Sequence, residues 1–121
     1  MAKILLAEDD SSMCDFLTMA LAREGHEVTA CHDGLAALDA LKGDDEYDLL
    51  LTDIVMPGMD GIELSQKASD LRPGLKVMFI TGFTAVAMDS TIKRAADTKL
   101  LSKPFHLKDL VQQVDKILQK A

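Results

Sequence analysis

The chain has 121 residues, which fits one domain, and 48% of them are hydrophobic, which is enough for a sizeable core. The formal net charge of −7 argues against a nucleic-acid surface, which needs a basic stripe, and against binding to an anionic membrane. Protein partners and small phosphorylated donors stay open. The apolar run near the N-terminus is too short for a signal peptide or a membrane span, so we expect a cytoplasmic protein.

Apolar and amphipathic segments alternate along the first half of the chain. A short apolar run at residues 3–7 predicts a strand, and residues 12–24 predict a helix. The expected apolar face of this helix consists of Met13, Phe16, Leu17, Ala20 and Leu21. Residues 27–31 suit a second strand, and regularly spaced leucines then mark a second helix that ends at Gly43. Residues 48–52 are apolar on both faces, which is typical of a central parallel strand.

The second half of the chain continues the alternation. Asp60 begins a sequence that resembles a capping box and opens a third helix. Residues 76–81 predict a fourth strand and residues 99–102 a fifth. The stretch 85–96 keeps helical spacing with a thin apolar stripe, and residues 107–119 form a clear amphipathic helix. Five repeats of strand then helix predict an α/β protein with a doubly wound, five-stranded parallel sheet and five helices.

Polar residues follow the carboxyl ends of four predicted strands. Glu8 and Asp9 follow the first strand, Asp53 follows the third, Thr81 stands at the end of the fourth and Lys103 follows the fifth. In an open α/β sheet these ends meet beside the crevice where the strand order reverses. We therefore expect acids, a hydroxyl and an ammonium to converge at one edge of the sheet.

This set of side chains favours metal-assisted phosphoryl transfer. Clustered carboxylates repel one another unless a cation lies among them, and oxygen ligands suit Mg²⁺. The ion would also screen the repulsion between anionic Asp53 and an anionic phosphoryl donor. Asp53 could then act as the nucleophile and become an aspartyl phosphate. Thr81 could hydrogen-bond one phosphoryl oxygen, and Lys103 could pair with another.

Four motifs carry a family resemblance in their order and spacing: "ILLAEDD", "DLLLTDIVMPGMDGIEL", "VMFITGF" and "LLSKPF". Over essentially its full length, the chain resembles the receiver domain of bacterial two-component response regulators. The resemblance implies a flavodoxin-like sheet with strand order 2-1-3-4-5. It also implies that Asp53 is the phosphoacceptor, that Asp9 and Asp53 bind Mg²⁺ directly and that Glu8 binds it through water. Val55 would supply a backbone carbonyl to the metal.

The same resemblance assigns the remaining residues of the site. Thr81 would be the switch hydroxyl and Lys103 the lysine of the family, with a cis bond between Lys103 and Pro104. The chain departs from the family at Leu100, where the family often has a Tyr or Phe that turns inward on activation. Val55 and Phe83 are apolar where they flank the phosphoryl site, so we expect them to limit the approach of water and to slow the loss of phosphate.

More narrowly, "AEDD", "TDIVMPGMDGIEL" and "KVMFITGF" are similar to CpdR-type regulators of alphaproteobacteria, which are stand-alone receivers linked to cell-cycle control through regulated proteolysis. The resemblance implies a histidine kinase or phosphotransfer protein as donor and a downstream protein target, with a protease system as one candidate. We expect residues 1–121 to form a single receiver domain with no output domain. A proteolysis adaptor, a flagellar-motor binder and a phosphorelay intermediate all stay open, with the adaptor ranked first.

Two alternative functions stay open beside the switch. A small Mg²⁺-dependent phosphatase could use the same aspartyl nucleophile, although Glu8-Asp9-Asp10-Ser11 stands where haloacid dehalogenase phosphatases carry a DxD pair. A pseudo-receiver would bind partners without phosphorylation, against which the intact set of acids, Thr and Lys argues. We expect no enzyme beyond the help that a receiver gives to its own phosphotransfer and dephosphorylation.

Plainer structural roles compete for several of these residues. Asp53 alone, before a Pro/Gly turn, would more often be a turn residue. Asp9 could be a helix N-cap, a role that Asp10 or Ser11 fits better, and Asp60 is expected to cap the third helix. The two cysteines form no CxxC and are expected to be reduced, partly buried thiols.

Overall fold

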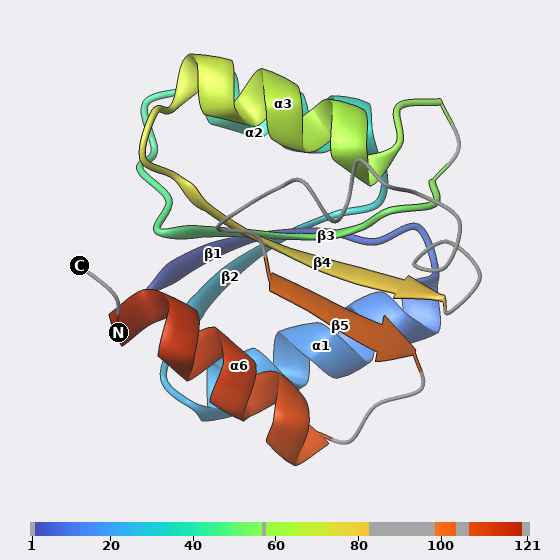
Figure 1. The fold of residues 1–121 in the computed structure, drawn as a ribbon, viewed down its shortest axis with the longest axis vertical. Helices are drawn as coiled ribbons and strands as arrows, with labels where there is room; N and C mark the ends of the chain where they lie inside the picture. Colours follow the sequence, from blue (N-terminus) through green and yellow to red (C-terminus); the bar gives the residue numbers. More distant parts are fainter. Residues whose placement is uncertain (1, 57, 83–98, 104–106, 120–121) are drawn as a thin grey trace.

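Five parallel strands form one sheet in the order β2-β1-β3-β4-β5 (Figure 1). The computed structural model describes residues 2–56, 58–82, 99–103 and 107–119. The strands are β1 (Lys3–Ala7), β2 (Glu27–Cys31), β3 (Leu49–Asp53), β4 (Lys76–Gly82) and β5 (Lys99–Lys103). The predicted α/β architecture with a parallel sheet is confirmed.

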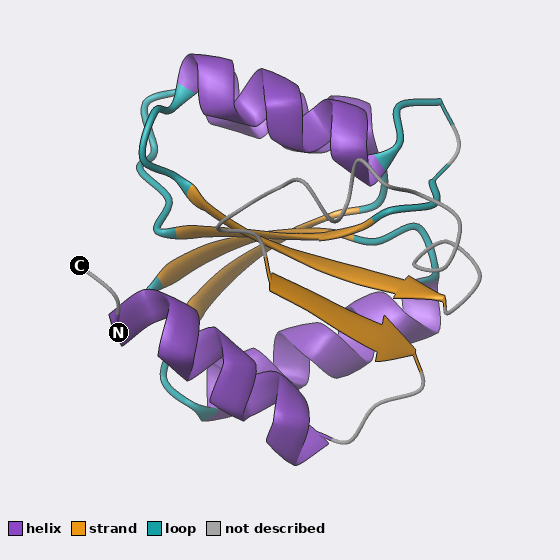
Figure 2. Ribbon diagram, in the orientation of Figure 1, coloured by secondary structure: helices purple, strands orange, loops and turns teal. Residues whose placement is uncertain are grey.

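Helices cover both faces of the sheet. The helices within the described residues are α1 (Ser11–Arg23), α2 (Gly34–Lys42), α3 (Gly61–Leu71) and α6 (Leu107–Gln119). Figure 2 shows α2 and α3 over one face and α1 and α6 over the other. The helix that we predicted at 85–96 lies outside the described residues.

Aspartates begin three of these helices. Asp10, Asp33 and Asp60 each have extended backbone, and each side chain accepts a hydrogen bond from the backbone N–H three residues later. This geometry satisfies one of the N–H groups that a helix leaves without an internal partner. The predicted cap at Asp60 is confirmed, and Asp10 rather than Asp9 caps α1.

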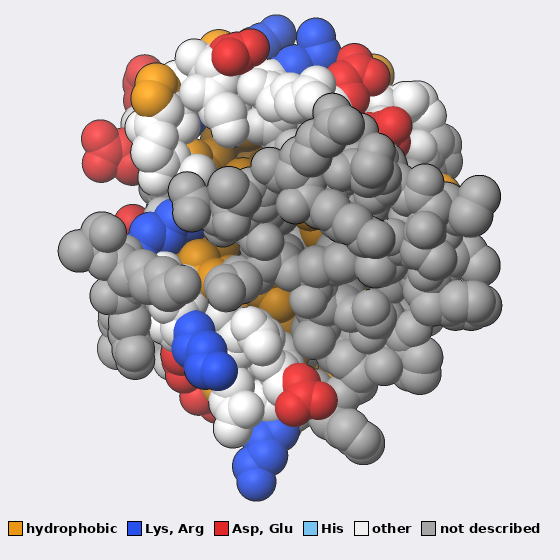
Figure 3. All heavy atoms as spheres, viewed as in Figure 1, with side chains coloured by type: hydrophobic (Ala, Val, Ile, Leu, Met, Phe, Trp, Pro, Cys, Tyr) orange, Lys and Arg blue, Asp and Glu red, His pale blue; other side chains and the backbone are white. Residues whose placement is uncertain are grey.

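The core lies on both faces of β3, all five residues of which are buried. Because side chains alternate along a strand, Leu49 and Leu51 pack in the cluster shared with α1 and α6, whereas Leu50 packs in the cluster shared with α2 and α3. Among the side chains coloured in Figure 3, charged groups gather over the helices and hydrophobic groups show mainly between them. No described helix is long and apolar enough to cross a membrane.

The prediction that Phe16 belongs to the core is wrong. Phe16 was expected on the buried face of α1, but 43% of its surface is exposed. The buried stripe runs through Cys14, Leu17 and Leu21, and Phe16 lies about 100° around the helix from Leu17. Met19, also on α1, is 63% exposed.

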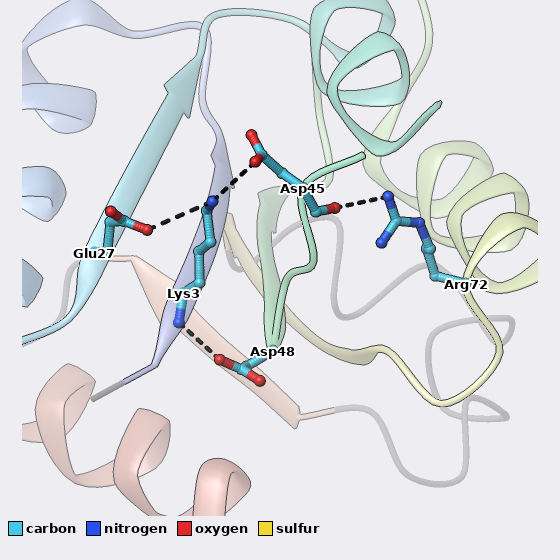
Figure 4. A network of polar contacts seen from close by, with 5 residues as sticks. All are labelled: Lys3, Glu27, Asp45, Asp48 and Arg72. Atoms are coloured by element: carbon cyan, nitrogen blue, oxygen red, sulfur yellow. Dashed lines mark hydrogen bonds and ion pairs between the residues drawn. The ribbon is translucent and has the colours of Figure 1, made fainter. Parts of the chain in front are cut away.

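The amino ends of the strands carry a polar network (Figure 4). Lys3 Nζ lies 3.5 Å from Glu27 and 3.3 Å from Asp45, and the Lys3 backbone N–H donates to Asp48 Oδ2 at 2.8 Å. The Arg72 guanidinium donates to the backbone carbonyl of Asp45 at 2.7 Å. These contacts join β1, β2, the loop before β3 and the end of α3.

Helix α6 is attached to the sheet at the same end of the molecule. Lys76 Nζ, at the start of β4, donates to the Ile117 carbonyl at 2.9 Å. His26 Nε2 lies 3.8 Å from Asp115 Oδ1, and His26 Nδ1 accepts a hydrogen bond from the Ala2 N–H at 3.3 Å. The contacts of Lys76 with Ile117 and of His26 with Asp115 hold the last turns of α6 against the sheet.

Candidate functional site

Three acidic side chains meet at the carboxyl ends of β1 and β3. Glu8 and Asp9 follow β1, and Asp53 is the last residue of β3. These strands are neighbours, and Ala7 pairs with Thr52, so the residues just beyond the pair are brought side by side. One carboxylate oxygen from each acid lies within 4.8 Å of the others. The structure therefore brings together the three acids that the sequence pattern placed at this edge.

The acids differ in their exposure. Glu8 is only 1% exposed and Asp53 only 7% exposed, whereas Asp9 is exposed. Backbone N–H groups face the two buried carboxylates: Asp10 donates to Glu8 Oε2 at 3.2 Å, and Val55 donates to Asp53 Oδ1 at 3.3 Å. Burial disfavours charged carboxylates unless donors or a cation stabilise them, so this arrangement favours a positive ion.

The chain leaves β3 through a turn held by backbone hydrogen bonds. The Ile54 N–H donates to the Ile80 carbonyl at 3.1 Å, and the Gly61 N–H donates to the Ile54 carbonyl at 2.8 Å. Gly58 adopts φ +77°, a left-handed conformation that glycine tolerates without strain. The side chain of Val55 is 66% exposed, while its N–H points at Asp53. The turn thus directs a backbone donor into the site and an apolar side chain outward.

The donor set of this cluster fits Mg²⁺. All of its ligand atoms are carboxylate oxygens, as hard divalent cations prefer, and no thiol or imidazole belongs to the cluster. Mg²⁺ characteristically takes few protein carboxylates and retains several waters. The exposed carboxylate of Asp9 leaves one side of the cluster accessible to a small ion and its waters.

The carboxyl ends of β4 and β5 lie at the same end of the sheet as Asp53. Thr81 pairs with Ser102 and Gly82 with Lys103, so the backbones of Thr81 and Lys103 sit at the carboxyl ends of adjacent strands. The ladder between β3 and β4 pairs Asp53 with Ile80, which places Thr81 one residue beyond the partner of Asp53. The side chains of Thr81 and Lys103 lie outside the described part of the structure.

Other sequence predictions also fall outside the described part. Phe83, the Lys103–Pro104 bond and the side chain of Leu100 all lie outside it, whereas the backbone of Leu100 pairs with Phe79 in the sheet. The proposed roles of these groups stay predictions.

Sequence reasoning missed one polar group next to the site. Thr52 is fully buried, and its hydroxyl Oγ1 donates to the backbone carbonyl of Asp53 at 2.9 Å. The available signal was a single hydroxyl after three leucines, in a strand that is apolar on both faces. The apolar pattern of this strand predicts only a core element and gives Thr52 no role.

Comparison with known proteins decides the family. Residues 4–115 match the family model described as the response regulator receiver domain. The chain belongs to the response regulator receiver domain family. Membership implies phosphorylation-based signalling in a two-component system, with aspartate phosphorylation and Mg²⁺ in an acidic pocket. In this receiver domain the structure has an acidic cluster of Glu8, Asp9 and Asp53.

Named relatives support the assignment. The chain is 52% identical over 118 residues to the response regulator receiver protein CpdR of Brucella abortus, covering 98% of each chain. Other curated relatives are longer. The chain spans 24% of the DNA-binding transcriptional regulator NtrC of Azospirillum brasilense and 53% of the transcriptional regulatory protein TctD of Salmonella typhimurium. It is therefore a CpdR-like receiver domain, and receiver domains of this kind are not classical enzymes.

Solved structures show the same fold. The receiver domain of the hybrid histidine kinase CckA matches with a TM-score of 0.82 and 31% identity, covering 97% of this chain and 99% of that one. The response regulator protein TrrA of Thermotoga maritima, solved in complex with Mg(2+)-BeF, matches with a TM-score of 0.83 and 29% identity at the same coverage.

Proposed function

We propose that this receiver domain is a switch in which Asp53 accepts a phosphoryl group. The observation that carries the proposal is the burial of Asp53, 7% exposed at the end of the central strand, within 4.8 Å of carboxylate oxygens from Glu8 and Asp9. Three carboxylates this close repel one another, and a bound cation would relieve that repulsion. Phosphoryl acceptance assisted by such a cation accounts for the grouping.

We assign the acids separate roles in that reaction. Asp9 and Asp53 would hold Mg²⁺ directly, Glu8 would hold it through water, and Val55 would offer its backbone carbonyl. When bound, Mg²⁺ neutralises charge on the transferring phosphoryl group. Asp53 presents a carboxylate oxygen to the phosphorus, and the Val55 N–H near Oδ1 limits its rotation. The bond to the donor breaks on the opposite side of the phosphorus from Asp53, and the leaving atom is the imidazole nitrogen of a phosphohistidine or the acyl oxygen of acetyl phosphate.

Two residues from the neighbouring strands complete the proposed switch. Thr81 is the second-last residue of β4 and Lys103 the last residue of β5, so their backbones lie at the same end of the sheet as Asp53. In our proposal the Thr81 hydroxyl and the Lys103 ammonium bind phosphoryl oxygens once Asp53 is modified. These contacts favour one arrangement of the surrounding surface, so that phosphorylation shifts a population between two states.

The proposed donor is a histidine kinase or a phosphotransfer protein, and the proposed output is contact with a downstream protein. The net charge of −7 favours protein over nucleic acid as the target. Similarity to CpdR over 98% of both chains supports one receiver domain across residues 1–121. From the resemblance of its motifs to CpdR-type regulators, we propose a role in regulated proteolysis and cell-cycle control. A pull-down that compares phosphorylated protein with Asp53→Ala tests the output, and identical partner sets would contradict a phosphorylation-dependent switch.

Acetyl phosphate with Mg²⁺ tests the central reaction. Intact mass measurement should show one added phosphoryl group on the wild-type protein and none on Asp53→Asn, which keeps the shape of the side chain and loses the nucleophile. A protein that hydrolyses many equivalents instead of holding one would be the Mg²⁺-dependent phosphatase. A protein that takes up none would be the pseudo-receiver.

Val55 allows a second test of the same site. Its exposed side chain flanks a buried carboxylate, so we propose that it slows the approach of water to the phosphorylated residue. The polar variant Val55→Asn should lose its phosphoryl group faster than the wild-type protein. Loss from the wild-type protein within seconds would contradict the shielding role.

A further inference from the structure

A buried hydroxyl lies immediately before the proposed phosphoacceptor, where packing alone gives it no purpose. Thr52 is 0% exposed and follows three leucines in β3. Valine has nearly the same shape and no polar atom to remove from water. The hydroxyl instead donates to the Asp53 carbonyl at 2.9 Å. The hydroxyl of Thr52 is therefore bonded to the backbone of Asp53, the residue that reacts.

That carbonyl lies where one of the two strand ladders has ended. The last pair between β1 and β3 joins Ala7 to Thr52, whereas the ladder between β3 and β4 continues to pair Asp53 with Ile80. Buried backbone carbonyls in folded proteins are paired with hydrogen-bond donors. The Thr52 hydroxyl supplies a donor to this carbonyl from the preceding residue of the same strand.

Helix α3 confines the same peptide. The Gly61 N–H donates to the Ile54 carbonyl at 2.8 Å. A Cβ at Gly61 would lie 2.9 Å from the Asp53 carbonyl carbon and 2.9 Å from Ile54 Cα, and it would overlap the Asp53 carbonyl oxygen. The peptide between Asp53 and Ile54 is thus held by a hydroxyl from the strand and by the closely packed start of a helix.

We propose that Thr52 is a positioning residue for phosphoryl acceptance. Its hydroxyl fixes the Asp53–Ile54 peptide, and this peptide sets the direction of the Asp53 carboxylate and the place of the Val55 N–H near Oδ1. Displacing a reacting group by about 1 Å can slow a reaction by about two orders of magnitude, so a single buried hydrogen bond here affects rate as well as stability. This inference rests on the proposed function of Asp53.

Two variants of Thr52 separate the effect of the hydroxyl from that of the methyl group. Thr52→Val removes the hydroxyl and keeps the shape, while Thr52→Ser keeps the hydroxyl and removes the methyl. The rate of phosphorylation by acetyl phosphate is measured by intact mass at saturating Mg²⁺, well below the unfolding temperature of each variant. We expect Thr52→Val to react about five-fold more slowly, as the loss of one hydrogen bond implies, and Thr52→Ser to keep the wild-type rate. If Thr52→Val does not fold, Thr52→Ala against Thr52→Ser makes the same comparison, because these two differ only by the hydroxyl.

The outcomes separate this inference from the function on which it rests. Failure of the wild-type protein to take up a phosphoryl group would overturn the role of Asp53 itself. Normal uptake by the wild-type protein with an equal rate in Thr52→Val would overturn only the positioning role. Equal slowing in the valine and serine variants would also overturn it, because a variant that keeps the hydroxyl would then react as slowly as one that lacks it. Amide shifts of Val55 on adding Mg²⁺ should change in Thr52→Val and be preserved in Thr52→Ser.

Discussion

The side chain of Asp10 accepts a hydrogen bond from the backbone N–H of Met13 at 3.1 Å, which makes Asp10 the cap of helix α1. Its own backbone N–H donates to Glu8 Oε2 at 3.2 Å. Asp9, which lies between Glu8 and Asp10 in the sequence, instead belongs to the cluster with Asp53. The adjacent residues Asp9 and Asp10 therefore have different roles, in the acidic cluster and in helix capping, and substitutions can separate these roles.

Asp10→Ala should lower the free energy of unfolding by about 1 kcal/mol, because the first turn of α1 loses its side-chain acceptor. Asp10→Asn, which can still cap, should stay near the wild-type value in urea unfolding. Asp9→Ala should weaken Mg²⁺ binding without a comparable loss of helix stability. If Asp9→Ala instead destabilised the protein as Asp10→Ala does, the division of tasks would be wrong.

Mg²⁺ should stabilise the folded protein, because the cluster of Glu8, Asp9 and Asp53 forms only on folding. At a concentration of about 100 times Kd, the gain is about 2.7 kcal/mol, and EDTA should reverse it. Without metal, Asp9→Asn should be more stable than the wild-type protein, because one of three mutually repelling charges is gone. The same variant should gain less from Mg²⁺. Thermal unfolding with and without the ion measures both effects, and an unchanged midpoint in the wild-type protein would count against a metal site.

Gly61→Ala should destabilise the protein by about 1–3 kcal/mol and slow phosphorylation of Asp53, because the new methyl would overlap the Asp53–Ile54 peptide. Gly43→Ala is the matched control. A Cβ there meets only the Ala40 carbonyl oxygen at 3.5 Å, an ordinary contact. Urea unfolding together with the acetyl phosphate assay tests the pair. Equal behaviour of the two variants would show that the close approach of α3 to β3 does not matter.

Arg72 should be important for stability and unimportant for the site. Its guanidinium donates to the backbone carbonyls of Leu41, Gly43 and Asp45 at 3.1, 2.8 and 2.7 Å, at and just beyond the end of α2. Arg72→Lys should lower the free energy of unfolding by about 1.5–3 kcal/mol, because one ammonium cannot reach all three acceptors in this geometry. Mg²⁺ affinity should be unchanged, and a large loss of affinity would show that the two ends of the sheet are coupled.

The two cysteines should react slowly with thiol reagents in the folded protein. Both are free and buried, as expected, and burial raises the pKa of both the Cys14 and the Cys31 thiol above the ordinary value of 9.0. Asp33 contributes further to the raised pKa of Cys31. Above about pH 9 the unfolded chain releases these protons before the folded protein does, so rising pH favours unfolding. Urea unfolding from pH 7 to pH 10 should show a shallower decline in Cys14→Ala/Cys31→Ala, and an equal decline would contradict this origin.

The acids of the site could be predicted because strand ends follow from hydrophobic pattern and parallel sheets gather those ends. Glu8 and Asp53 interrupt apolar runs, and an interruption of this kind is visible in the letters. The caps at Asp10 and Asp60 have equally local signals, because the capping bond spans only three residues.

The missed features depend on direction and distance in space. The bond from Thr52 to the Asp53 carbonyl depends on the rotamer of a buried hydroxyl and on where the β1 ladder stops. Arg72 reaches carbonyls 27 to 31 residues away in sequence, which no local pattern encodes. Phe16 was misplaced because an apolar residue at the margin of a helical stripe can face either way.

The hydrogen bond from Lys76 attaches only the C-terminal part of α6 to the start of β4. Its C-terminal turns are pinned to the amino ends of the strands, whereas its first residue, Leu107, follows four positions after Lys103 at the other end of β5. The contact from Lys76 therefore restrains the C-terminal turns of α6. Replacing this donor in Lys76→Met should raise amide exchange near Ile117 more than near Leu110.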